Sequence, residues 1–146
     1  MNIWTYYKSI SRRLLIWSGL SVLAGLVLVF LSPLWAGVGT QAIGWGLVDA
    51  AIAVGGGLFI QRRHSQMAQS EDPNVLATEA RRLRTILWIN AGLDVFYISG
   101  GLALALLGDP AQPFWRGTGW GIVPQGAFLL LFDSLHALNV PRPNTD

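Results

Sequence analysis

Four long apolar stretches constrain the fold of this chain more than any other feature. A helix needs about 20 mostly apolar residues to cross roughly 30 Å of hydrocarbon. The stretches run from Leu14 to Leu31, and from about Val38 to Ile60, Leu83 to Leu107 and Gly117 to Leu138. Only 12% of the residues are charged, against roughly 25% in an average soluble domain. We therefore expect an all-α bundle of four transmembrane helices in a single domain over residues 1–146.

The alternative of a soluble helical bundle conflicts with the first stretch. A helix of a soluble bundle keeps a polar face toward water, and Leu14 to Leu31 has no charged residue and no such face. Turns are predicted at Ser32-Pro33 and at Asp109-Pro110, because proline cannot continue a helix. The composition also disfavours a disordered chain, and the absence of cysteine excludes disulfides and cysteine-ligated metals.

The basic residues predict the orientation in the membrane. Nine of the ten lie on one side of the predicted spans, and only Arg116 lies on the other. By the positive-inside rule, both termini then lie in the cytoplasm, in a bacterial cytoplasmic membrane. The same asymmetry explains the high pI without a nucleic-acid partner. The nine are Lys8, Arg12, Arg13, Arg62, Arg63, Arg81, Arg82, Arg84 and Arg142.

Two segments outside the spans are expected to touch the membrane surface. Near the N-terminus, Ile3, Trp4, Tyr7, Ile10 and Leu14 recur at near-helical spacing, which favours a short amphipathic helix in the headgroup layer. Residues 61–82 are predicted to form the cytoplasmic linker, with a turn at its middle from Ser70 to Asn74. The residues expected to anchor the chain to lipid are Trp4, Arg12, Arg13, Arg62, Arg63, Arg81, Arg82 and Arg84.

An internal similarity suggests two tandem copies of a two-helix hairpin. Gly44-Trp45-Gly46-Leu47-Val48 recurs as Gly119-Trp120-Gly121-Ile122-Val123. The first copy would cover about residues 12–60 and the second about 83–140. Both copies would enter the membrane from the same side, as parallel repeats. We expect Gly44, Gly46, Gly117 and Gly121 to pack helices together, because association in lipid depends on close backbone contact.

Acidic residues lie inside three of the predicted spans, where burial of a charge costs at least about 2.5 kcal/mol. Asn90, Asp94 and Tyr97 form a polar stripe on the third span, and Asp49 lies in the second. Gln125, Asp133 and His136 share a face of the fourth span, with Asp133 and His136 one turn apart.

Two interpretations of these side chains stay open. In the first, internal hydrogen bonds satisfy them. Asp94 accepts from Asn90 and Tyr97 or from a serine of the first span, a neutral Asp49 bonds Gln125 or a backbone carbonyl, and Asp133 pairs with His136. In the second, Asp49 and Asp94 face a shared cavity that binds a proton, a cation or a small amphiphile.

The sequence offers little support for catalysis or for a cofactor. It contains neither Gly-x-Ser-x-Gly nor His-Glu-x-x-His. His64 and His136 are the only histidines that could ligate a haem, and Phe132 lies one turn before His136, where it would obstruct a flat macrocycle. We expect a non-enzymatic protein without a metal or other cofactor.

The chain resembles a group of small, uncharacterised bacterial four-helix membrane proteins built from two hairpins. The resemblance rests on Trp-Gly-x-Val-Asp from Trp45 to Asp49, following Gly37-x-Gly39-x-Gln41. It implies a carboxamide or an acid at the Asp49 position of both copies, and Pro124-Gln125 departs from that pattern here. The group has no assigned activity, so the resemblance bears on fold and location only.

Two functions follow as hypotheses. The first is a small accessory or scaffold subunit of a membrane complex, or a homo-oligomer, with the lipid bilayer and other subunits or further copies as partners. The second is a carrier or binder of a proton, cation or small amphiphile that uses Asp49 and Asp94.

Overall fold

The computed structural model describes residues 2–66 and 72–141, and these residues form four helices. They are α1 (Ile3–Leu28), α2 (Pro33–Gln66), α3 (Pro73–Leu107) and α4 (Pro113–Leu138). All four are long and apolar enough to cross a membrane. The all-α four-helix prediction is therefore confirmed. The expected turn residues Ser70 and Glu71, and also Arg142, lie outside the described residues.

The helix ends follow from local chemistry. Asn2 caps α1 by accepting a hydrogen bond from the Trp4 backbone N–H at 3.1 Å. Asp72 caps α3 in the same way through the Asn74 N–H at 2.7 Å, and Pro73 follows in the first turn, where proline needs no N–H partner. Prolines also open α2 and α4, so both hairpin turns fall where the sequence predicts them.

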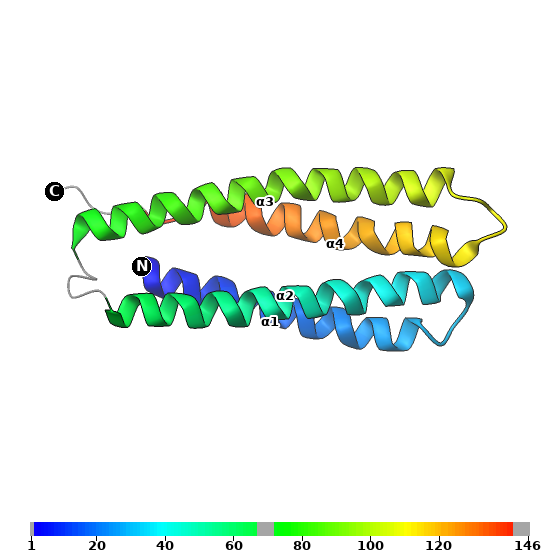
Figure 1. Ribbon diagram of the computed structural model, residues 1–146, viewed down its shortest axis with the longest axis horizontal. Helices are drawn as coiled ribbons and strands as arrows, with labels where there is room; N and C mark the ends of the chain where they lie inside the picture. Colours follow the sequence, from blue (N-terminus) through cyan, green and yellow to red (C-terminus); the bar gives the residue numbers. More distant parts are fainter. Residues whose placement is uncertain (1, 67–71, 142–146) are drawn as a thin grey trace.

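Two antiparallel hairpins build the bundle. α1 packs along α2, and α3 packs along α4, while α2 and α4 join the two hairpins. The α1–α2 and α3–α4 turns lie at the same end of the molecule, with the start of α1 at the opposite end (Figure 1). α2 and α3 barely contact each other, which leaves a space between the hairpins on that side.

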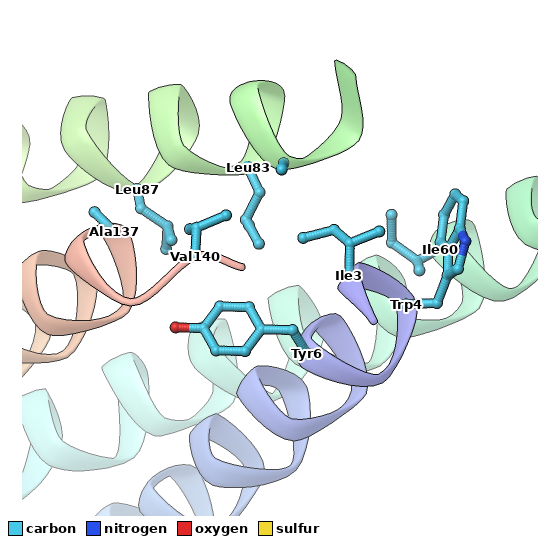
Figure 2. Packing of buried hydrophobic residues seen from close by; sticks show 9 residues of the cluster. Ile3, Trp4, Tyr6, Ile60, Leu83, Leu87, Ala137 and Val140 are labelled. Atoms are coloured by element: carbon cyan, nitrogen blue, oxygen red, sulfur yellow. The ribbon is translucent and has the colours of Figure 1, made fainter. Parts of the chain in front are cut away.

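The interfacial helix expected at the N-terminus is not a separate element. Trp4, which we expected to anchor the chain to lipid, is buried inside the protein. Residues Ile3 to Leu28 form one continuous helix, and the Trp4 side chain is 3% exposed. The first turn of α1 packs among Ile60 of α2, Leu83 of α3 and Val140, which follows α4 (Figure 2).

The lengths of α2 and α3 explain this burial. With 34 and 35 residues they extend about 50 Å, well beyond the roughly 30 Å of hydrocarbon. Their ends therefore give the first turns of α1 a protein surface to pack against, and most of the predicted linker is helical.

Candidate functional site

A cavity of about 430 Å³ lies between α2 and α3, with residues of α1 and α4 as its remaining wall. Most of the lining is apolar. Its rim includes the exposed side chains of Ile52, Phe59 and Leu93, so the cavity opens on the outer surface that would face lipid. Five side chains that the sequence singles out line it together: Asp49, Asn90, Asp94, Tyr97 and Asp133.

Asp49 and Asp94 are the distinctive groups of this cavity. They are 2% and 3% exposed, and each has a buried Oδ2 atom without a hydrogen-bond partner in the described part of the chain. Buried polar atoms in proteins are normally hydrogen-bonded, and an orphaned one calls for a specific explanation. Both residues also line the cavity, so their carboxyl groups lie at its wall.

Gln125 and His136 do not line this cavity, and their partners differ from those proposed. Gln125 accepts hydrogen bonds from Trp17 Nε1 at 3.1 Å and from Ser21 Oγ at 3.5 Å, so its amide faces α1 and not Asp49. His136 lies within 2.6 Å of the Phe132 carbonyl through Nδ1 and within 3.3 Å of Arg13 through Nε2. Because Arg can only donate, Nε2 accepts and Nδ1 carries the proton of a neutral ring.

The glycines expected to pack helices fall into two groups. A Cβ on Gly121 would lie 2.9 Å from the Val38 carbonyl, and one on Gly46 would lie 2.9 Å from the Ser18 carbonyl. Gly117 meets the Leu34 carbonyl even more closely. Gly44 differs, because a Cβ there would meet nothing within 4 Å. The packing role expected for Gly44 is therefore wrong within this chain: its position on α2 points out of the bundle.

Several predicted lipid anchors have partners inside the protein. Arg63 forms an ion pair with Glu79 at 2.7 Å, Arg84 bonds the Ala137 and Val140 carbonyls, and the Arg82 guanidinium lies 5.7 Å from the centre of the Phe59 ring. Arg12, Arg62 and Arg81 are exposed.

Sequence reasoning missed two features near the outer end of the cavity. Glu79, placed in a solvated linker, is 1% exposed and is held by Arg63. Tyr7 and Arg82 line the cavity, although both were assigned to the membrane surface. The spacing of Ile3, Tyr7 and Ile10 does mark a buried helix face, but the pattern cannot tell lipid from protein as the covering partner.

These features define a class: a bundle of four helices apolar enough to cross a membrane, with unpartnered carboxyl groups beside a cavity that opens on the outer surface. The chain belongs to a family of unknown function, DUF6992, whose match covers residues 13–134. No curated protein and no solved structure matches the chain. The match includes every residue of the cavity except Tyr7, Ile10 and Ser11.

Proposed function

We propose that this protein is a non-enzymatic integral membrane protein that binds a small amphiphile in the cavity between α2 and α3. The observation that carries the proposal is the pair of buried carboxyl groups, Asp49 and Asp94, that line a cavity with unpartnered oxygens. An acid inside a membrane span is costly and is a candidate functional group by default. A well-satisfied structural role would leave these oxygens hydrogen-bonded, as Gln125 is.

The shape and chemistry of the cavity favour an amphiphile. Small-molecule sites are mostly apolar with a few placed polar groups, and about 430 Å³ lies in their usual size range. The apolar walls would hold a hydrocarbon body, and the carboxyl groups would hold the polar end. Because α2 and α3 barely touch, such a molecule can enter sideways from the bilayer.

The membrane and orientation belong to the same proposal. We propose that this end of the bundle lies in the cytoplasm, in a bacterial cytoplasmic membrane, and the basic residues at the ends of α2 and α3 support this orientation. The cavity extends from Phe59 and Arg82 near that end to Trp45 and Tyr97 deeper in the spans. Its occupant would therefore lie in the cytoplasmic half of the bilayer.

A second candidate function is that of an accessory subunit or a homo-oligomer, and one observation favours it. Six glycines in the described helices are exposed, and a Cβ at any of them would meet nothing within 4 Å: Gly19, Gly44, Gly55, Gly56, Gly92 and Gly100. Small residues let helices in lipid approach closely, and these positions offer that approach to another chain. A mass of two or more chains, or of a foreign subunit, in native mass spectrometry of the detergent-extracted protein would support it; monomers alone would contradict it.

We also propose that the hairpins are two copies, in a register different from the Gly-Trp-Gly match. Gly25 packs against Gly39, and Gly101 packs against Gly119. Gly46 lies against the Ser18 carbonyl, and Gly126 lies against the Asp94 carbonyl. In each of the four helices these contact residues are seven positions apart, which supports the new register. The residues concerned are Ser18 and Gly25, Gly39 and Gly46, Asp94 and Gly101, and Gly119 and Gly126.

A substitution that fills the cavity with a large side chain tests the binding proposal. Gly56 lines the cavity, and Gly55 beside it does not, while both have open space around a Cβ. We expect a diazirine derivative of decanol to label cavity residues of the wild-type protein in a saturable way. Gly56→Trp should remove that labelling and Gly55→Trp should retain it. Equal labelling of both variants, or only unsaturable labelling of the outer surface, would contradict the proposal.

A further inference from the structure

We propose that the cavity selects a hydrophobic monovalent cation, whose charge lies between Asp49 and Asp94 and whose body lies among the aromatic side chains. This inference rests on the binding function proposed above and names the chemical class of the ligand. It is carried by three observations: the sign of the charges, the arrangement of the carboxyl groups and the aromatic lining.

The sign of the charges is the first observation. Three acidic side chains line the cavity, and two of them keep buried oxygens without a partner in the described part of the chain. Among the described residues of the lining, Arg82 is the one basic side chain, and its guanidinium already lies over the Phe59 ring. It is 12 residues before Asp94 on the same helix, or about 18 Å away by helical rise. The inner part of the cavity therefore carries acidic groups without a cation of its own.

The arrangement of the carboxyl groups argues against a bare metal ion. A metal site needs several ligand atoms converging on one point. Within residues 2–66 and 72–141, no group of three or more acidic or histidine side chains is placed to hold one. Although Asp49, Asp94 and Asp133 line the same cavity, they are spread over its wall. A larger cation with a diffuse charge can satisfy carboxyl groups that do not converge.

The aromatic lining is the third observation. Five aromatic side chains line the cavity, and two of them, Trp45 and Tyr97, pack edge to face with centroids 4.9 Å apart at its inner end. Aromatic faces attract organic cations, and rings combined with acids are how proteins recognise quaternary ammonium groups. Apolar walls exclude small hydrated ions, since these would lose their water without replacement. The five are Tyr7, Trp45, Phe59, Tyr97 and Phe132.

Tetraphenylphosphonium and tetraphenylborate form a matched pair of probes, because they share size and shape and differ in the sign of the charge. In equilibrium dialysis of the full chain in dodecyl maltoside, we expect saturable binding of tetraphenylphosphonium and no saturable binding of tetraphenylborate. Equal binding of both ions, or stronger binding of the anion, would overturn the cation assignment.

Substitutions of single acidic residues test which carboxyl groups contact the bound cation. Asp49→Asn and Asp94→Asn keep the side-chain shape and should each weaken binding by about tenfold or more, as the loss of a charge-assisted contact does. Asp109→Asn removes the same charge from the exposed turn between α3 and α4 and should leave binding unchanged. Unchanged binding in both cavity variants would overturn the proposal.

A variant of an exposed aromatic side chain keeps the test independent of the folding of the acid variants. Tyr97 is 42% exposed, so its replacement leaves the core intact. Tyr97→Leu should weaken tetraphenylphosphonium binding by about two- to fivefold, and Tyr97→Phe should restore it. Equal binding by both variants would contradict a role for the ring.

The outcomes also separate this inference from the proposed function. If decanol labels the cavity and tetraphenylphosphonium does not bind, the cavity binds amphiphiles and the cation assignment is wrong. If neither probe is retained, both proposals fail.

Discussion

The two long sides of the bundle differ in whether their buried polar groups have hydrogen-bond partners. On the side where α1 faces α4, the Trp17 and Phe128 rings stack 3.7 Å apart, and Gln125 is bonded to Trp17 and Ser21. We call these four residues the closed face. On the side where α2 faces α3, Trp45 and Tyr97 meet edge to face, and Asp49 and Asp94 keep unpartnered oxygens. We call these four residues the open face.

The difference shows that the same arrangement of two hairpins gives one face with satisfied polar groups and one face with a cavity. On the closed face, an amide and a hydroxyl satisfy each other, and the stacked rings fill the space beside them. This is what a structural polar cluster in lipid requires. On the open face, Asp49 and Asp94 keep unpartnered oxygens, and a cavity lies beside them. In the register that we propose for the two hairpins, Gln125 would correspond to Trp45, and Leu129 would occupy the position equivalent to Asp49.

The largest effect is expected at the α2–α4 contact, which lies between the two faces. A Cβ on Gly37 would overlap the Phe114 carbonyl and the Thr118 N–H, both backbone groups that cannot move aside cheaply. Gly37→Leu should therefore lower the free energy of unfolding by at least about 3 kcal/mol, the upper range for overpacking. Gly100→Leu, with nothing within 4 Å of its Cβ, is the control and should melt like the wild type in detergent. Equal stability of both variants would show that the two hairpins are not joined at this contact.

The next largest effect is expected from removal of an aromatic side chain, and the loss of unfolding free energy should differ between the two faces. Phe128→Ala removes the stacking partner of Trp17 and should cost about 2 kcal/mol, below the range for a fully buried ring because Phe128 is half-buried. Tyr97→Ala removes the exposed ring of the open face and should cost less than about 1 kcal/mol. Unfolding by titration with sodium dodecyl sulfate measures both. A larger cost for Tyr97→Ala would mean that the open face is the structural one.

The smallest change in the free energy of unfolding is expected when a polar group is replaced, and its sign should differ between the closed face and the open face. Gln125→Leu leaves the Trp17 N–H and the Ser21 hydroxyl without their partner and should destabilise by about 1 kcal/mol. Asp49→Asn removes a costly buried acid with an unpartnered oxygen, and it should be neutral or slightly stabilising. The same unfolding titration checks both. Destabilisation by Asp49→Asn as large as that by Gln125→Leu would mean that Asp49 holds the fold together.

The sequence predicts the coarse fold well because apolar length is a strong signal in lipid. The four stretches and the prolines at their ends suffice to place four helices and two turns. The pattern does not reveal how far the helices continue beyond the hydrocarbon. The apolar face of Ile3 and Tyr7 is real, but only the three-dimensional arrangement shows that α2 and α3 project far enough to cover it.

The candidate site could be predicted in part. Asn90, Asp94 and Tyr97 line one cavity as their helical spacing suggests, and Asp49 joins them from the neighbouring hairpin. Gln125 and His136 could not be assigned, because a polar residue in a span gives no sign of which neighbour it faces. The Gly-Trp-Gly match does not indicate which glycine packs, because Gly44 and Gly119 lie in similar sequences, yet within the described residues only Gly119 packs against another helix.

Chemical modification of the acids tests the central claim most directly, because it reads which carboxyl groups a molecule dissolved in the bilayer can reach. Dicyclohexylcarbodiimide is an apolar reagent that adds to carboxyl groups and leaves a mass that peptide mapping locates. We predict adducts on Asp49 or Asp94 that tetraphenylphosphonium suppresses, and none on Glu79, which is buried and paired with Arg63. Modification of Glu79 with Asp49 and Asp94 both untouched would contradict an open face that admits a ligand.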